Sequence, residues 1–253
     1  MTYQPYQHPA FPRPLNLNAV IWRYMDVSKF VDVVEHSRLY MARADLLRND
    51  HEGTTPLAEL EHWRDLLECA ETEEQRQIIR ANREQLSEFA QIFRPTYYVS
   101  CWHMAPDENV AMWDRYVQSN DAIAIGSTFV RLRSVLDQRV IEVGMIRYID
   151  YDKQRLPSLN QLQLIMHKRH FFRDEREVRA VMWSMTPERA RVEPFLTPDG
   201  RGFLAQIDPK ALIERVVLHP RIKSKSVSRI AALCSAVGLP APRASRMGAQ
   251  PSF

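Results

Sequence analysis

Short β-prone segments recur along most of the chain, and several of them are separated by too few residues to hold a crossover helix. Parallel neighbouring strands require such a crossover, whereas antiparallel strands can follow one another through short turns. Helical patterns lie between other segments, but without a regular strand–helix–strand rhythm. The sequence therefore predicts an α+β fold with a central, mostly antiparallel or mixed sheet flanked by helices.

One region contains no β-prone segment. From Pro56 to Phe93 the composition shifts to Glu, Gln, Arg, Leu and Ala. Thr72, followed three residues later by Gln75, fits a capping box, which predicts that a second helix begins there. We therefore expect a helical insertion over 56–93.

The rest of the chain predicts one domain. Its 253 residues, 45% of them hydrophobic, are enough for a single large core. The first 18 residues contain four prolines and little periodicity, which predicts an extended Pro-rich arm over 1–18. We expect a single α+β domain over 19–247 and a tail over 248–253.

Composition excludes several classes of protein. Only seven glycines occur, and no Gly-rich loop is present to hold the phosphates of a dinucleotide or a nucleoside triphosphate. Three widely spaced cysteines form neither a disulfide framework nor a zinc-binding spacing, and no run of 18 apolar residues occurs. These features predict a cytoplasmic protein without a metal site or a membrane span.

Charge leaves the choice of partner open. The net charge is only +3, and the basic excess is concentrated in 219–229 and 242–247. Such a weak positive balance permits a polyanionic partner without requiring one.

The segment FFRDEREVRAVMW, residues 171–183, is the most unusual part of the chain. We expect a helix over 159–172 followed by a strand from about residue 174, on which Glu175 and Glu177 share one face. Two carboxylates on one face repel each other unless a cation or a ligand lies between them. They could therefore line a cleft and bind a hydroxyl or a ribose. Alternatively, they are paired with neighbouring basic side chains, namely Arg173, Arg179 or Lys168.

Two other strands carry polar residues in apolar surroundings. Arg23 interrupts the strand 19–25, and such an arginine usually has a fixed anionic partner, which could be Glu177 or a ligand phosphate. Ser100 lies near the end of the strand 96–102, beside Trp102, and Tyr116 follows on the next helix. This serine could orient a nucleotide or a ribose, or the aromatic residues could simply belong to the core.

The order of these segments resembles a widespread bacterial family of unknown function, some members of which are linked to phage defence. Its members show a W-x-x-Y helix, here Trp113 and Tyr116. A lysine, here Lys168, then precedes an E-x-E-x-R strand, here Glu175 to Arg179. The resemblance covers roughly residues 19–247.

A weaker resemblance concerns the ADP-ribosyltransferases, which use NAD and carry, in order, an arginine on the first core strand, a serine on a later strand and an E-x-E. The matching residues are Arg23, Ser100, Glu175 and Glu177. The resemblance implies that Arg23 holds the NAD pyrophosphate and that Ser100 orients the strand or the nicotinamide ribose. It also implies that Glu177 is the catalytic residue and that Glu175 positions or deprotonates the acceptor.

The proposed NAD site would also need aromatic side chains for stacking, and the candidates are Tyr24, Trp102 and Tyr116. The first hypothesis is therefore an ADP-ribosyltransferase-like enzyme of a defence or toxin system, acting on a macromolecular or nucleic-acid acceptor. The alternatives are a nucleic-acid-associated or nuclease-like defence protein, and a non-catalytic binding module in which the E-x-E strand is structural.

Overall fold

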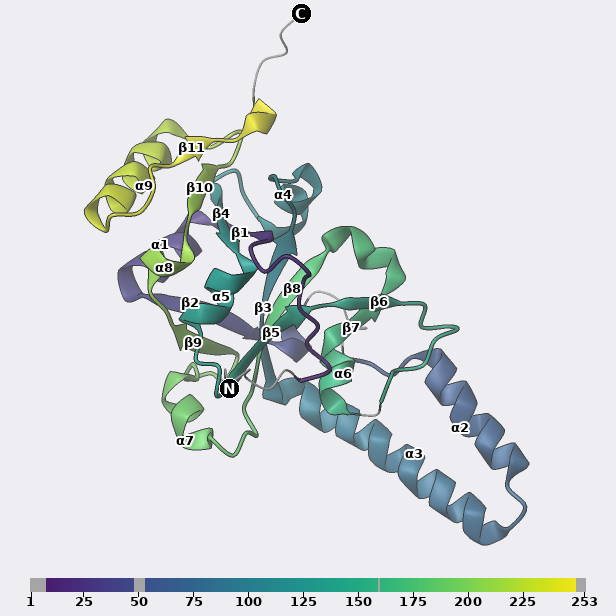
Figure 1. Ribbon diagram of the computed structural model, residues 1–253. Helices are drawn as coiled ribbons and strands as arrows, with labels where there is room; N and C mark the ends of the chain where they lie inside the picture. Colours follow the sequence, from purple (N-terminus) through teal and green to yellow (C-terminus); the bar gives the residue numbers. More distant parts are fainter. Residues whose placement is uncertain (1–7, 48–52, 159, 249–253) are drawn as a thin grey trace, which may run out of the picture.

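The computed structural model describes residues 8–47, 53–158 and 160–248, and within them it shows an α+β protein built on a nine-stranded, mostly antiparallel sheet (Figure 1). The expected fold class is confirmed. The strands are β1 (Val20–Asp26), β2 (Arg38–Arg43), β3 (Tyr97–Met104), β4 (Ala122–Thr128), β5 (Ile141–Met145), β6 (Arg147–Ile149), β7 (His167–Arg169), β8 (Glu177–Trp183), β9 (Gly202–Gln206), β10 (Arg215–Leu218) and β11 (Arg243–Ala244). The α-helices are α1 (Val27–His36), α2 (Leu57–Cys69), α3 (Glu73–Phe93), α4 (Val110–Tyr116), α5 (Phe129–Val135), α6 (Gln161–Met166), α7 (Arg189–Val192), α8 (Pro209–Leu212) and α9 (Ser224–Ala236).

The large sheet forks at its central strand, β3. Along one edge, β3 pairs with β8 over residues 97–103, and β8 in turn pairs with β5. Along the other edge, the start of β3 pairs with β2 and its end pairs with β1. Strands β1 and β2 therefore diverge beside Ser100. Strands β4, β10 and β11 extend the sheet beyond β1, and β9 extends it beyond β2.

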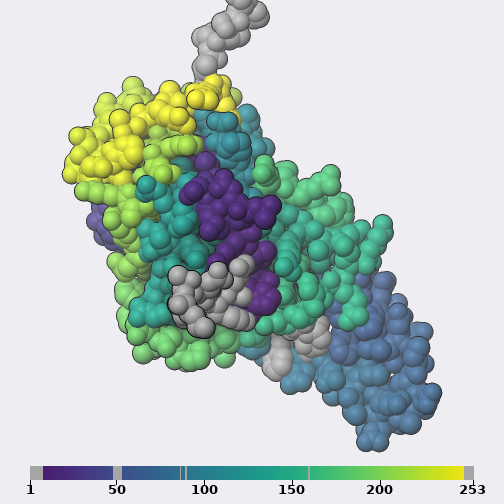
Figure 2. Space-filling view, in the orientation of Figure 1, coloured from purple at the N-terminus to yellow at the C-terminus, as the bar shows by residue number. Residues whose placement is uncertain are grey.

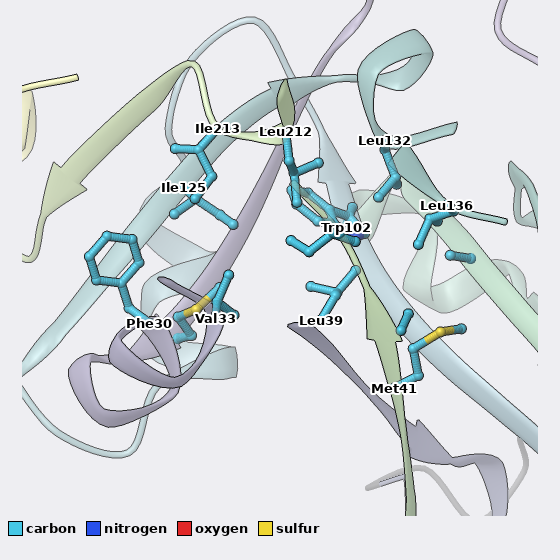
Figure 3. Packing of buried hydrophobic residues seen from close by; sticks show 14 of the residues in the cluster. Phe30, Val33, Leu39, Met41, Trp102, Ile125, Leu132, Leu136, Leu212 and Ile213 are labelled. Atoms are coloured by element: carbon cyan, nitrogen blue, oxygen red, sulfur yellow. The ribbon is translucent and has the colours of Figure 1, made fainter. Parts of the chain in front are cut away.

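The two faces of this sheet are packed against different elements. Cross-strand partners lie on the same face, so the register of β3 and β8 places Ser100 with Ala180 and, on the opposite face, His103 with Glu177. The Ser100 face packs against α1, α5, α8 and α9 and forms the main hydrophobic core (Figure 3). The Glu177 face packs against α4 and α6.

The region 56–93 holds two helices, as expected, and they form the α2–α3 hairpin, which projects from the body of the protein (Figure 1). The Thr72 hydroxyl accepts a hydrogen bond from the Gln75 amide, and the Gln75 side chain accepts one from the Thr72 amide, so the predicted capping box is present. Within the described residues, no helix is both long enough and apolar enough to cross a membrane.

The N-terminal arm, as far as it is described, lies across the body rather than projecting from it (Figure 2). Ala10 and Phe11 are buried, and the Met145 amide donates a hydrogen bond to the Pro12 carbonyl at 2.7 Å. A Cβ atom at Gly144 would lie 2.6 Å from the Phe11 Cα. The close packing of the arm on β5 therefore requires glycine at this position. Residues 1–7 of the predicted arm and 249–253 of the predicted tail lie outside the described residues.

Two predicted elements differ from the structure. The expected strand over 140–150 is divided into β5 and β6, which belong to different sheets, because the Ile146 amide donates to the Glu177 carbonyl at 2.9 Å. The expected helix over 159–172 ends at Met166, where β7 begins and pairs in parallel with β6. Lys168 consequently lies on strand β7, where it is buried, and not on the expected helix.

Candidate active site

A buried ionic cluster lies on the Glu177 face, at the start of β8. The ammonium group of Lys168 contacts Glu175 Oε2 at 2.5 Å and Glu177 Oε2 at 3.3 Å. Arg179 Nε contacts the other oxygen of Glu177 at 2.7 Å, while its Nη1 donates to the Ile165 carbonyl at 2.7 Å. The two carboxylates of the E-x-E segment therefore do come together, and two of the basic residues that the sequence offered as partners neutralise them.

The backbone before β8 brings these carboxylates together in a way that strand alternation did not predict. Glu175 ends a 3-10 helix, His170–Glu175, and Arg176 has a left-handed conformation with φ of 40°. The Met104 amide donates to the Arg176 carbonyl at 3.0 Å, which fixes the turn against the end of β3. The expectation that Glu175 lies on the strand is wrong, because the strand begins at Glu177.

The pKa values of the two carboxyl groups are displaced in opposite directions. Burial raises the pKa of Glu175, and the attraction of Lys168 only partly offsets it. Burial also opposes the ionisation of Glu177, but Arg179 and Lys168 outweigh it and lower the pKa of this carboxyl to about 2. Such a divergence between neighbouring carboxyl groups is typical of acid–base sites.

The cluster reaches the surface through α4. Arg115 Nη1 contacts Glu175 Oε1 at 2.9 Å, and its Nη2 contacts the exposed Asp174 at 3.1 Å. The Arg115 side chain is 35% exposed, so it connects the buried carboxylates with solvent. Tyr116, a predicted stacking residue, is half-buried nearby, and burial followed by the charges of Glu177 and Glu175 raises its pKa.

His103 is a further candidate that the sequence analysis missed. Its Nδ1 lies 2.6 Å from the Glu175 carbonyl oxygen, so Nδ1 carries the proton and Nε2 is left as the acceptor. Burial lowers the pKa of this imidazole, which keeps it neutral. Among the described residues, Nε2 is buried without a hydrogen-bond partner. In the sequence, the one indication of His103 was strand alternation, which places it with Cys101 on the face opposite to Ser100.

The fork of the sheet holds the other predicted pair. The guanidinium group of Arg23 donates one hydrogen bond to the Ser100 hydroxyl and another to the Tyr40 carbonyl at 2.9 Å. Burial lowers the Arg23 pKa to about 10. Arg23 thus bridges β3 and β2 at the point where β1 and β2 diverge. Because Ser100 and Glu177 point to opposite faces, the structure does not bring Arg23 and Ser100 together with Glu177.

The remaining predicted residues are also divided between the two faces. Trp102 is buried in the main core, and its Nε1 donates to the Ser100 hydroxyl at 3.0 Å (Figure 3). Tyr24 lies on the Glu177 face, packed edge-on against Trp113 at a ring-centroid distance of 4.9 Å, and its hydroxyl accepts from the Asn109 amide. Among the predicted stacking residues, Tyr116 is therefore the one beside the carboxylate cluster. Within the described part of the chain, no group of His, Cys, Asp and Glu is arranged to hold a metal ion.

Comparison with known proteins gives a distant structural likeness. No protein-family model matches the sequence, and no curated protein is similar to it. Three solved structures of DarT from Thermus sp. 2.9 are similar. The complex with ADP-ribosylated ssDNA has a TM-score of 0.36 and 10% identity, and the match covers 92% of this chain and 95% of that one. The complex with NAD+ has a TM-score of 0.36 and 9% identity, with 94% and 100% covered. At this level the likeness assigns neither a substrate nor a site residue.

Proposed function

We propose that this protein is an ADP-ribosyltransferase-like enzyme that cleaves the N-glycosidic bond of NAD at Glu177. The observation that carries the proposal is the pair of buried carboxylates bridged by Lys168, whose pKa values move in opposite directions. One group stays ionised at every physiological pH, and the other has its pKa shifted towards the range in which proton transfer is efficient. NAD is the donor that the resemblance to ADP-ribosyltransferases implies.

Each carboxylate has a distinct role in the proposed step. The bond between C1′ of the nicotinamide ribose and the ring nitrogen breaks, and the electron pair leaves with neutral nicotinamide. Glu177, held ionised by Arg179 and Lys168, stabilises the positive charge that develops on the ribose. The nucleophile of the acceptor then attacks C1′, and its proton passes to Glu175. Arg115, whose side chain is 35% exposed, is the part of the cluster that solvent reaches, and in this proposal the anionic substrate approaches from its side.

The fork at Arg23 and Ser100 has no part in this step. The two side chains satisfy each other and the Tyr40 carbonyl on the opposite face of the sheet. We propose that they stabilise the divergence of β1 and β2, and that the catalytic groups lie on the Glu177 face alone.

The test measures nicotinamide released from NAD, and label transferred from adenine-labelled NAD, in the presence of nucleic acid or bacterial extract. We expect Glu177→Gln to lower both by about a hundredfold or more. Glu214→Gln is the control, because the Glu214 carboxylate lies outside the cluster and pairs with Arg131 at a distance of 2.8 Å. If Glu177→Gln fails to fold, Glu177→Asp, which keeps the negative charge, replaces it in the test. No turnover by the native chain, or equal turnover by the folded variants, would leave the cluster with a structural role only.

A specific observation favours nucleic acid as the acceptor. Four basic residues around the start of α9 are all exposed, and the segment 219–229 contains no acidic residue. They are Arg221, Lys223, Lys225 and Arg229. The exposed Arg243, on β11, lies at the same end of the molecule (Figure 1). Clustered exposed cations of this kind bind the phosphate backbone.

Fluorescence anisotropy with labelled single-stranded and duplex oligonucleotides tests this assignment. We expect binding that weakens with salt, and the double variant Lys223→Gln/Lys225→Gln should reduce the logarithmic salt slope by about 1.5. A control double variant, Lys29→Gln/Lys153→Gln, removes two exposed lysines outside this segment and should leave the slope unchanged. Equal slopes for the two double variants would contradict a nucleic-acid acceptor bound here.

A further inference from the structure

The backbone that carries Glu175 is strained where it enters β8. Arg176, the next residue, has φ of 40° and ψ of 50°, a left-handed conformation that is unfavourable for any residue with a Cβ atom. A strained residue keeps such a conformation only where its surroundings fix it. The contacts of this turn therefore determine where the Glu175 carboxylate points.

The end of β3 supplies two of these contacts. The Met104 amide donates to the Arg176 carbonyl at 3.0 Å, through the backbone alone. His103 Nδ1 donates to the Glu175 carbonyl at 2.6 Å, and thus holds the peptide group that joins Glu175 to Arg176. Only the second contact is made by a side chain, so a substitution of His103 removes it while the backbone contact stays.

Glu177 is held by other groups. Its amide donates to the Tyr148 hydroxyl at 2.8 Å, and its carbonyl accepts from the Ile146 amide at 2.9 Å. Its carboxylate accepts from Arg179 Nε at 2.7 Å. Loss of the imidazole contact therefore acts first on Glu175.

The His103 ring is buried and neutral. Its exposed fraction is 4%. The charged groups that face it are Arg176 and Asp174, from the turn, and Arg115, from α4. Burial, together with the two arginines, lowers the pKa of the imidazole despite its hydrogen bond to the Glu175 carbonyl and the attraction of Asp174. The ring therefore carries a single proton at neutral pH, on Nδ1.

We propose that His103 is a positioning residue for Glu175. The hydrogen bond from Nδ1 keeps the strained turn closed and holds the Glu175 carboxylate beside the ammonium group of Lys168. When this bond is absent, Arg176 relaxes to an ordinary backbone conformation and Glu175 turns towards solvent. The catalytic consequence rests on the proposed function, in which Glu175 takes the proton of the acceptor, whereas the geometric consequence does not.

Two substitutions separate the nitrogen atoms of the ring. The side-chain amide of asparagine reaches about as far as Nδ1, so His103→Asn keeps a donor for the Glu175 carbonyl. The amide of glutamine reaches the position of Nε2, an atom without a hydrogen-bond partner among the described residues, so His103→Gln loses that donor. His36→Gln is the control, because His36 is 53% exposed and contacts Asp32 at 3.2 Å.

The first readout is the pKa of Glu175, measured by carboxyl carbon NMR of the full chain without NAD and assigned with Glu175→Gln. Burial raises this pKa, so it should stay raised in His103→Asn and in the control, and fall to the ordinary range in His103→Gln. The charged groups that face the carboxylate are present in all these chains: Lys168 on β7, Glu177 on β8 and Arg115 on α4. Equal pKa values in the folded asparagine and glutamine variants would overturn the proposal.

Relief of the strain provides a second arm. Glycine adopts the left-handed conformation without a steric penalty, so adding Arg176→Gly to His103→Gln should restore the raised pKa of Glu175. A pKa that stays ordinary would show that the imidazole does not act by holding a strained turn. If His103→Gln fails to fold, nitrogen NMR of the native His103 ring decides, because a proton on Nε2 in place of Nδ1 would overturn the proposal.

Turnover is the third readout. In the assay of nicotinamide release and label transfer, His103→Gln should lower kcat for transfer about tenfold or more and leave the KM for NAD unchanged, while His103→Asn should keep most of the activity. A changed Glu175 pKa without any turnover of NAD by the native chain would refute the proposed function and leave the positioning role standing. Undiminished transfer by His103→Gln would overturn the catalytic consequence.

Discussion

Glu175 and Glu177 are bridged by a single ammonium group, that of Lys168, which lies 2.5 Å from one carboxylate and 3.3 Å from the other. All three side chains are buried. Two carboxylates this close cannot both stay ionised in a buried site without a cation between them. Lys168 therefore acts together with Arg179 and Arg115 on the protonation of the pair, and it stabilises this end of β8.

The first prediction concerns the removal of that cation. Lys168→Met should lower the free energy of unfolding by about 3–5 kcal/mol, because it leaves buried carboxylates incompletely neutralised. Urea denaturation at neutral pH measures the effect. Lys153→Met is the control, since Lys153 is 81% exposed and lies 3.7 Å from Asp150; it should cost less than about 1 kcal/mol. A loss as small as that of the control would mean that Lys168 is not the link between the carboxylates.

The second prediction concerns pH. The Glu177 pKa is lowered from 4.5 to about 2 in the folded state, so its stabilisation is present above pH 4.5 and is lost as the pH falls towards 2. The Glu175 pKa is raised, so its contribution is lost in the other direction, as the pH rises above 4.5. Urea denaturation between pH 2.5 and 7 should show Glu177→Gln with a weaker acid-induced loss of stability than the native chain.

The same series should show the opposite change for Glu175→Gln, whose stability relative to the native chain should improve as the pH rises above 4.5. At each pH, the unfolding free energy of the variant is subtracted from that of the native chain. This difference removes the contribution of other acidic groups, such as Asp32 and Asp137, whose pKa values are also lowered. Parallel stability curves for the native chain and the two variants would contradict the opposed displacements.

Sequence reasoning succeeded where the determining contacts are local. The α2–α3 hairpin follows from composition and from a capping box that spans three residues, Thr72 to Gln75. The pairing of the E-x-E carboxylates with Lys168 or Arg179 was also an explicit alternative, because those basic residues lie within nine positions of Glu177.

It failed where contacts between distant segments override a local pattern. The helical pattern of 159–172 stops at Met166 because β7 pairs with β6, about 20 residues earlier in the chain. The contacts of His103 and Arg115 with Glu175 span 72 and 60 residues, so no local spacing indicates them. The separation of Ser100 from Glu177 depends on the register of β3 and β8, which the sequence alone does not supply.

The third prediction concerns the fork between β1 and β2. Arg23→Met and Ser100→Ala should be coupled by about 1 kcal/mol in a double-mutant cycle of unfolding free energies, since the two side chains are hydrogen-bonded to each other. Arg23→Lys should recover only part of the loss, because one ammonium group cannot reproduce the planar bridge to both Ser100 and the Tyr40 carbonyl. Strictly additive losses would show that the hydrogen bond contributes nothing to the fork.

The fourth prediction concerns the N-terminal arm. Gly144→Ala places a Cβ atom 2.6 Å from the Cα of Phe11 and 2.8 Å from its carbonyl carbon, which are backbone atoms that cannot rotate away. We expect a loss of about 1–3 kcal/mol in the free energy of unfolding, as in other overpacked sites. In a chain that lacks residues 1–12 the clash disappears, so the same substitution should cost almost nothing there. An equal loss in the full-length and shortened chains, measured by urea denaturation, would mean that the arm does not press on β5.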